Sequence, residues 1–106
     1  MNSVTLILTT VSTEAQAQTL VDTIMAYRLA GCAQIDAPIT STYWWKGQLE
    51  SASEIRCWFK VPASTQATVM QAIKDHHPFD VPQIVAIQAE ALPDYATWLE
   101  DAVQKS

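Results

Sequence analysis

Two adjacent histidines, His76 and His77, carry the side chains best suited to chemistry in this sequence. Imidazoles are common ligands of copper, zinc and nickel, so the pair is a candidate metal site. Both end an expected helix, because Pro78 stops the helical pattern directly after them. Adjacent helical positions diverge by about 100°, so the two rings can share one ion only where the helix frays. Alternatively, one of them lies on the buried face that contains Ile73 and hydrogen-bonds to backbone near the helix end.

Two cysteines offer softer ligands, and Cys32, directly after Gly31 at the start of an expected strand, is the metal candidate. A small buried hydrophobic residue explains it equally well. Cys57 alternates with Trp58 and is no stronger as a ligand. The sequence shows no secretory signal, so we expect two reduced thiols rather than a disulfide.

Glu54 and Lys60 are the charged pair most suited to a ligand pocket. They share an expected strand at even separation, so they point to the same face, where they could bind a polar ligand or pair with other charges. A solvated face is the alternative. Only two glycines occur, which excludes a Gly-rich phosphate loop and a dinucleotide fingerprint. No nucleophile with a neighbouring base stands at a readable spacing, so catalysis has no local support.

Length and charge limit the remaining classes. The 106 residues fit one domain, residues 1–106, and half of them are apolar. The net charge is -5 and the six Lys and Arg residues are scattered, so nucleic acid and anionic membranes are not expected partners. The N-terminus has no basic segment and its apolar run breaks after Leu8, so we expect a cytoplasmic protein without a membrane span.

The first half of the chain predicts a strand, a helix and a long hairpin. Residues 4–10 form the strand, and Thr13 with Gln16 opens a helix that runs to about Leu29 with Gly31 as its C-terminal cap. Residues 32–45 and 48–61 then alternate on either side of Lys46-Gly47, with Pro38 marking a bend or bulge.

The second half predicts a helix, a strand and a helix. Ser64 opens the helix that ends at the histidines, and residues 81–89 form a strand buried on both faces. The last helix follows Pro93 and has an apolar stripe formed by Tyr95, Trp98, Leu99, Ala102 and Val103. The order βαββαβ plus a helix predicts an α+β fold of the ferredoxin-like type, with two helices on one face of a four-stranded antiparallel sheet.

Adjacent tryptophans, Trp44 and Trp45, stand at the expected tip of the hairpin. In a strand they point to opposite faces, so one small core cannot hold both. A strand of about fourteen residues reaches ~45 Å, whereas the radius of gyration typical of this length is ~13 Å. We therefore expect an arm that projects from the domain and is covered by sister subunits. Shorter strands, with both tryptophans capping one core, are the alternative.

Several segments together carry a resemblance to a known family. They are RLAGCAQI (28–35), Ser41-Tyr43-Trp45-Gly47, Glu54, Lys60, HHPFDVPQI (76–84) and YATWL (95–99). In order and spacing they resemble the CutA family over nearly the whole chain. The resemblance implies a ferredoxin-like homotrimer akin to PII signalling proteins and, in bacteria, an association with tolerance to divalent cations, copper above all.

The resemblance also places sites. The paired histidines of copper-associated bacterial members fall on His76 and His77, and Cys32 keeps one family cysteine. The cysteine at the end of the first strand is replaced by Thr9, which weakens a copper site because a thiolate favours Cu(I). The implied cleft between subunits is lined by Ser41, Tyr43, Trp45, Glu54 and Lys60.

These observations predict a cytoplasmic homotrimer that binds divalent metal, copper first, without demonstrated catalysis. The alternative is a PII-like regulatory module that binds a small anion or nucleotide in the intersubunit cleft. A further alternative is an enzyme that uses the cleft, with Lys60, Glu54 and His77 as its polar groups.

Overall fold

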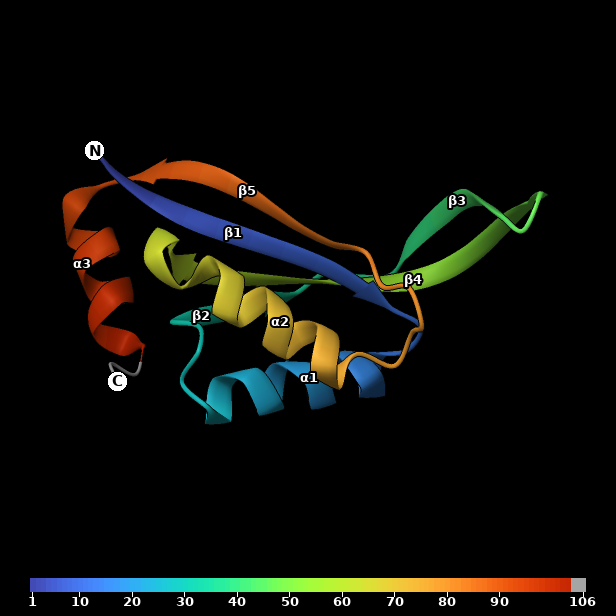
Figure 1. Ribbon diagram of the computed structural model, residues 1–106, viewed down its shortest axis with the longest axis horizontal. Coiled ribbons are helices and arrows are strands. Elements are labelled where there is room, and N and C mark those ends of the chain that lie inside the picture. The colour runs from blue at the N-terminus through green and yellow to red at the C-terminus, as the bar shows by residue number, and fades with distance from the viewer. Residues whose placement is uncertain (104–106) are drawn as a thin grey trace.

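The structure is a computed structural model that describes residues 1–103. Its elements are β1 (Asn2–Val11), α1 (Glu14–Ala26), β2 (Cys32–Ile35), β3 (Ile39–Trp45), β4 (Gln48–Pro62), a short 3-10 turn (Ala63–Thr65), α2 (Gln66–His76), β5 (Ile84–Ala91) and α3 (Pro93–Ala102). The sheet has the order β2-β4-β1-β5 with antiparallel neighbours, and β3 continues the pairing along the outer part of β4 (Figure 1). This arrangement confirms the predicted ferredoxin-like α+β fold with a C-terminal helix.

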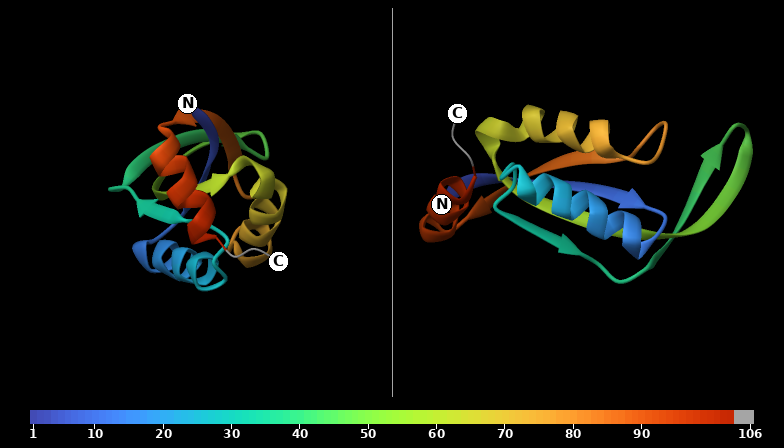
Figure 2. Two further views of the ribbon diagram at one scale, coloured as in Figure 1. Left: turned by 90° about the vertical axis from the view of Figure 1, so that its left-hand side faces the viewer. Right: turned by 90° about the horizontal axis from the view of Figure 1, so that it is seen from below.

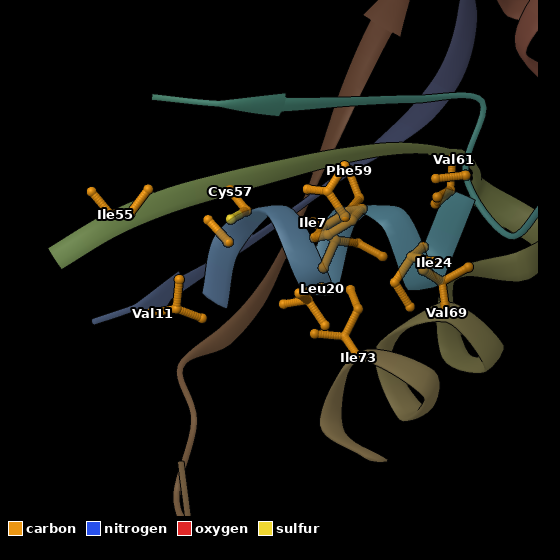
Figure 3. Packing of buried hydrophobic residues seen from close by; sticks show 13 residues of the cluster. Ile7, Val11, Leu20, Ile24, Ile55, Cys57, Phe59, Val61, Val69 and Ile73 are labelled. Carbon is orange, nitrogen blue, oxygen red and sulfur yellow. The ribbon is translucent and has the colours of Figure 1, made fainter. Parts of the chain in front are cut away.

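Helices α1 and α2 lie side by side on one face of the sheet, and the main core fills the space between them and the strands (Figures 2 and 3). Phe59 of β4 and Ile7 of β1 meet Ile24 and Ile73 of the helices, and all four side chains are fully buried. Burial of one such side chain stabilises the fold by about 1.5–3 kcal/mol. Among residues 1–103, no helix is long and apolar enough to cross a membrane.

The predicted hairpin forms, with a break on one side. Residues 36–38 separate β2 from β3, so the bend expected at Pro38 is confirmed. At the tip, Lys46 and Gly47 both have positive φ, 50° and 77°, as a two-residue type I′ turn requires. β3 and the outer part of β4 project beyond the body as an arm, hereafter residues 39–54, and lengthen the molecule to 45 × 26 × 23 Å (Figure 1).

The break between β2 and β3 is fixed by Asp36. Arg56 Nε and Trp58 Nε1 both donate to its Oδ2, at 2.8 and 2.9 Å, and its own N–H donates to the Arg56 carbonyl. The hydrogen bonds from Arg56 and Trp58 hold the pKa of the Asp36 carboxyl below its ordinary value, because both stabilise the charged form. The carboxylate thus joins the bend to the strand that runs through body and arm.

The end of α1 differs from the sequence prediction. The helix ends at Ala26 with Tyr27 as its C-cap, and Arg28, not Gly31, adopts the left-handed conformation with φ 55°. Gly31 is needed for close packing instead. A Cβ atom there would stand 2.5 Å from Leu99 Cδ1, so a larger residue would push α3 away from the sheet.

Strand β5 and its neighbours also differ from the prediction. β5 starts at Ile84 rather than Val81, and it is covered on one face only, since Val85 and Ile87 are each 43% exposed. Their cross-strand partners are Leu8 and Leu6, which are half-buried on the same open face. The apolar run therefore signals a second covered face that the single chain does not supply.

The predicted apolar stripe of α3 is correct in part, because Leu99 and Val103 are buried and Ala102 is half-buried. Ala96 and Leu99 are buried against Val4, at the end of the sheet far from the arm (Figure 1). Tyr95 and Trp98 are exposed instead and stack on each other with ring centroids 5.7 Å apart. The stripe was thus wrong for its two aromatic residues and left out Ala96, which is buried.

Candidate functional site

A groove of about 690 Å³ lies at the base of the arm, between β3, the end of β1 and the loop that precedes β5. Four residues of the predicted cleft line it: Ser41, Tyr43, Trp45 and Glu54. The other lining residues are Thr10, Ser12, Thr42, Ala52, Ser53, Phe79, Asp80, Val81 and Gln83. Residues that are distant in sequence therefore form one concave site, the kind of place where small ligands bind.

Strand alternation explains which arm residues face this groove. Ser41 pairs with Ala52 across the hairpin, so Tyr43 and Trp45 point to the same face two and four residues further on. Trp44 points to the opposite face, where its cross-strand partner is Leu49. The adjacent tryptophans therefore lie on opposite faces of the arm. The side chain of Trp45 is 45% exposed, whereas that of Trp44 is 73% exposed.

The charges of the groove have one sign. Among residues 1–103, its lining contains the carboxylates of Glu54 and Asp80 and no lysine, arginine or histidine. Lys60, predicted to act with Glu54, shares its face of β4 but stands six residues away, about 20 Å along the strand. Its Nζ lies 5.9 Å from the ring centre of Tyr95 on α3. Within one subunit, Lys60 therefore belongs to another site.

His77 stands behind the groove with both ring nitrogens engaged. The Phe79 N–H donates to Nδ1 at 3.1 Å, so in the neutral ring Nε2 carries the proton. Nε2 lies 3.0 Å from the Thr10 carbonyl oxygen and 2.9 Å from Thr9 Oγ1. Burial lowers the pKa of His77, and this outweighs the Thr10 carbonyl and the Glu54 charge, which favour the protonated ring. The neutral imidazole thus ties the loop after α2 to β1.

These contacts distinguish the environments of the two histidines. His77 is the histidine on the buried side, as the second interpretation of the sequence proposed, although the carbonyl it contacts belongs to β1 and not to the helix end. His76 is the last residue of α2 and is exposed, with its ring centroid 6.0 Å from that of Tyr27. Metal binding by His77 would require the loss of at least one of its hydrogen bonds.

The predicted metal ligands do not converge within one subunit. Cys32 pairs with Lys60 across the sheet, whereas Thr9, which touches His77, pairs with Cys57 three positions further along β4. In the part of the chain that the structure describes, residues 1–103, no three His, Cys, Asp or Glu side chains are grouped as a metal ion requires. The donor set of His76, His77 and Cys32 therefore does not fit a single copper ion in this arrangement.

Thr9 has a local structural role beside His77. It is fully buried, and its hydroxyl satisfies the hydrogen-bonding capacity of the His77 ring. The position that the resemblance assigns to a family cysteine is thus a spatial neighbour of His77. Because a neutral hydroxyl is a much poorer copper ligand than a thiolate, the replacement turns this contact into a structural one.

Sequence reasoning missed the loop side of the groove. Phe79, Asp80 and Val81 line it, whereas none of the three is among the site residues predicted from the sequence. The sequence pattern that could have indicated this side is an aromatic and an acidic residue, Phe79 and Asp80, between Pro78 and Pro82, because the two prolines make the segment rigid. The hydrogen bond from Phe79 to His77 then fixes where that segment sits.

Comparisons with known proteins agree over most of the chain. The family model described as "CutA1 divalent ion tolerance protein" matches residues 5–102. The divalent-cation tolerance protein CutA of Escherichia coli (strain K12 / DH10B) is 32% identical over 99 residues, which cover 92% of this chain and 88% of that protein.

Solved structures of similar proteins have the same fold. CutA from Synechococcus elongatus PCC7942 is 30% identical with a TM-score of 0.90 and covers 98% of this chain and 93% of its own. The Archaeoglobus fulgidus protein, described as a periplasmic divalent cation tolerance protein CutA, is 27% identical with a TM-score of 0.89 and covers 95% and 99%. The chain belongs to the CutA1 family of divalent ion tolerance proteins.

Proposed function

We propose that this protein acts in divalent-cation tolerance as a homotrimer without catalysis, in the cytoplasm. The family match over residues 5–102 supports the role in cation tolerance. The observation that carries the assembly is the amount of apolar surface that one subunit leaves open. Trp44 and Leu49 on the arm are 73% and 60% exposed, and Val85 and Ile87 on the sheet are each 43% exposed.

Two separate surfaces of this kind favour a closed ring of copies over a single pair. Exposed apolar area costs about 25 cal/mol per Å², so its burial by sister subunits stabilises an oligomer. The arm and the open sheet face lie on different parts of the subunit, so each can meet a different neighbour, as in a heterologous interface. The family resemblance implies that three copies close this ring.

Sedimentation equilibrium tests the assembly. We expect a mass of three chains of 11.7 kDa over the micromolar range. A stable folded monomer at micromolar concentration would refute the trimer, and a dimer would show that the two surfaces meet one neighbour only.

For the cation itself, we propose Cu(II) binding of modest affinity that begins at the exposed imidazole of His76. His77 is engaged by Phe79 and by the Thr9 and Thr10 oxygens, so it is not available without local rearrangement. Imidazole binds copper more tightly than zinc according to the general stability order, and no thiolate is placed to add Cu(I) selectivity.

Calorimetry with CuCl2 distinguishes the histidines. We expect His76→Ala to remove most of the binding, while His77→Gln keeps it wherever that variant stays folded. Equal affinity in wild type and in the His76→Ala variant would move the site elsewhere, with Cys32 as the next ligand to replace. Binding should fade below about pH 6.5, the ordinary imidazole pKa, because copper competes with protons for the ring.

The groove supports a second candidate, a PII-like regulatory module that binds a small molecule at the base of the arm. Its volume of about 690 Å³ lies within the range of small-molecule sites. The enzyme alternative has weaker support, because its three polar groups are dispersed: Glu54 lines the groove, His77 is tied behind it, and Lys60 lies beside Tyr95. A thermal-shift screen of metabolites on the purified oligomer tests this candidate.

A further inference from the structure

The lining of the groove at the base of the arm specifies the charge of its ligand. In the part of the chain that the structure describes, its two charged side chains are the carboxylates of Glu54 and Asp80, and the rings of Tyr43 and Trp45 on β3 add aromatic surface. We propose that the groove binds a small organic cation, an aliphatic amine, whose ammonium groups are recognised by Glu54 and Asp80 and by the rings of Tyr43 and Trp45. This goes beyond the proposed role in divalent-cation tolerance and changes the ligand class of the second candidate.

The first argument is that neither carboxylate has an ion-pair partner among the described residues. Among residues 1–103, the one ion pair joins Arg56 to Asp36, so the nearest arginine on the groove's strand is already neutralised. Glu54 is half-buried, which strengthens its interaction with a cation relative to full exposure to water. Burial lowers the pKa of His77, but Glu54 acts on that ring in the opposite direction and favours its positive form.

The second argument is that an ammonium group already lies over the aromatic wall. Lys46 Nζ is 5.7 Å from the ring centre of Trp45, within the range of a cation–π contact. Tyr43 lies on the same face of β3 two residues before Trp45, so both rings border the groove. The lysine at the turn thus shows, within the chain itself, the contact that a bound amine would make.

The third argument concerns size and selection against anions. A groove of about 690 Å³ admits a small molecule, and hydroxyl groups of Thr10, Ser12 and Ser41 supply hydrogen-bond acceptors for N–H donors. Among residues 1–103, a phosphate or carboxylate ligand would meet two negative side chains, and the lysine beside the groove, Lys46, is engaged with the Trp45 ring. Anion and nucleotide sites use such cations or helix N-termini, so this lining selects against them.

The site is distinct from the proposed copper contact. His76 is not part of the lining, so a failure of copper binding leaves the amine site untouched, and the reverse also holds. Two carboxylates can also bind a hydrated metal ion in place of an amine. Magnesium is the ion to compare, because it prefers oxygen ligands and keeps several of its waters. The experiment therefore includes magnesium alone.

Calorimetry on the native oligomer at low salt tests the ligand class with three molecules of matched length. We expect 1,4-diaminobutane to bind, and the neutral 1,4-butanediol and the anionic succinate not to bind. The variants Glu54→Gln and Asp80→Asn should each weaken diamine binding about tenfold, as loss of a charged hydrogen-bond partner does. The matched control is Glu90→Gln, which removes the same charge on β5, where it pairs with Ser3 at the other end of the sheet.

Tryptophan fluorescence measures the same binding without relying on the heat of binding that calorimetry detects. Diamine should change the emission of the wild type, and Trp45→Phe should remove most of the change while it keeps an aromatic ring. Melting curves of each variant confirm that it is folded. The inference is overturned where the diamine does not bind, where succinate binds as tightly, where Glu90→Gln weakens binding as much as Glu54→Gln, or where MgCl2 binds at these carboxylates and the diamine does not.

Discussion

Strand β4 runs through two regions that are stabilised in different ways. In the body, Cys57, Phe59 and Val61 have no exposed surface, because two helices cover them. In the arm, the same strand pairs with β3 alone, and no helix of residues 1–103 covers either face (Figure 1). An isolated two-stranded hairpin is marginally stable in water, so the arm depends on something outside its own pairing. The body supplies its own partners, and the arm presents contacts to others.

This difference separates folding from function within one chain. The body fixes the positions of β1 and of the loop after α2, which form one wall of the groove. The arm contributes the aromatic wall and extends beyond the core. Changes in the body are therefore expected to act on stability at every protein concentration, whereas changes in the arm are expected to act on association and ligand binding.

The largest effect is expected from Phe59→Ala in the body. Phe59 is fully buried between the sheet and both helices, so its truncation removes apolar contacts and leaves a cavity. We expect a loss of about 3–5 kcal/mol in the free energy of unfolding. Urea denaturation at two protein concentrations measures it, and the loss relative to wild type should be similar at both. A cost below about 1 kcal/mol would show that the body does not depend on this core.

A smaller effect of a different kind is expected from Trp44→Ala on the arm. Its side chain is 73% exposed in one subunit, so truncation leaves no cavity in the monomer. If sister subunits cover it, the variant should lose about 2 kcal/mol of association free energy, as central aromatic contacts do. The trimer should therefore dissociate at higher protein concentration in sedimentation experiments.

Thr40→Ala is the matched control for Trp44→Ala, since Thr40 is exposed and points to the same face of β3. It should leave the association unchanged. A Trp44→Ala variant that assembles as tightly as Thr40→Ala would place this face of the arm in solvent and would weaken the contrast between arm and body.

The same contrast explains what the sequence could predict. Element order, the bend at Pro38 and the turn at Lys46-Gly47 were correct, because period, proline and positive-φ preferences are local. Within the single chain β5 is covered on one face and not on both, and the sequence does not reveal this, since a strand covered by a helix and a strand covered by another subunit have the same apolar pattern. Gly31 was misassigned because its role depends on Leu99, 68 positions away.

The groove was predictable in part for the same reason. The arm residues Tyr43, Trp45 and Glu54 follow from alternation along one hairpin and from the family resemblance. Asp80 lines the groove because His77 anchors the loop after α2 to β1. These contacts join His77 to Thr10 and Thr9, which are 67 and 68 positions away in the sequence. Lys60 lies outside the groove of its own subunit, because equal parity along a strand fixes the face and not the distance.

The anchor at His77 gives a pH-dependent test of the body. Burial holds the folded-state pKa of His77 below 6.5, so the unfolded chain binds more protons between that folded pKa and 6.5. The stabilisation is therefore fully present above pH 6.5 and is lost as the pH falls below it. We expect the free energy of unfolding, measured in metal-free buffer, to decrease in this range, and His77→Gln to flatten the slope.

His76→Gln is the control for that measurement, because His76 is exposed on the adjacent position of the chain. Its slope should match the wild type. A slope that persists in His77→Gln would assign the acid sensitivity to other groups. It would also show that the His77 contacts do not hold the loop after α2 in place.

The smallest effect is expected at the boundary between the two regions, from Asp36→Asn. Arg56 and Trp58 both donate to this carboxylate, but the Asp36 and Arg56 side chains are 35% and 38% exposed, so water and salt screen the ion pair. We expect a loss of about 0.2–1 kcal/mol at low salt, less at 1 M salt, and no change for Glu100→Gln as the control. The Asp36 contribution should also disappear as the pH falls below 3.8, since its pKa is lowered in the folded state. A loss as large as that of Phe59→Ala would make the bend part of the core, and the division between body and arm would then lie further out along β4.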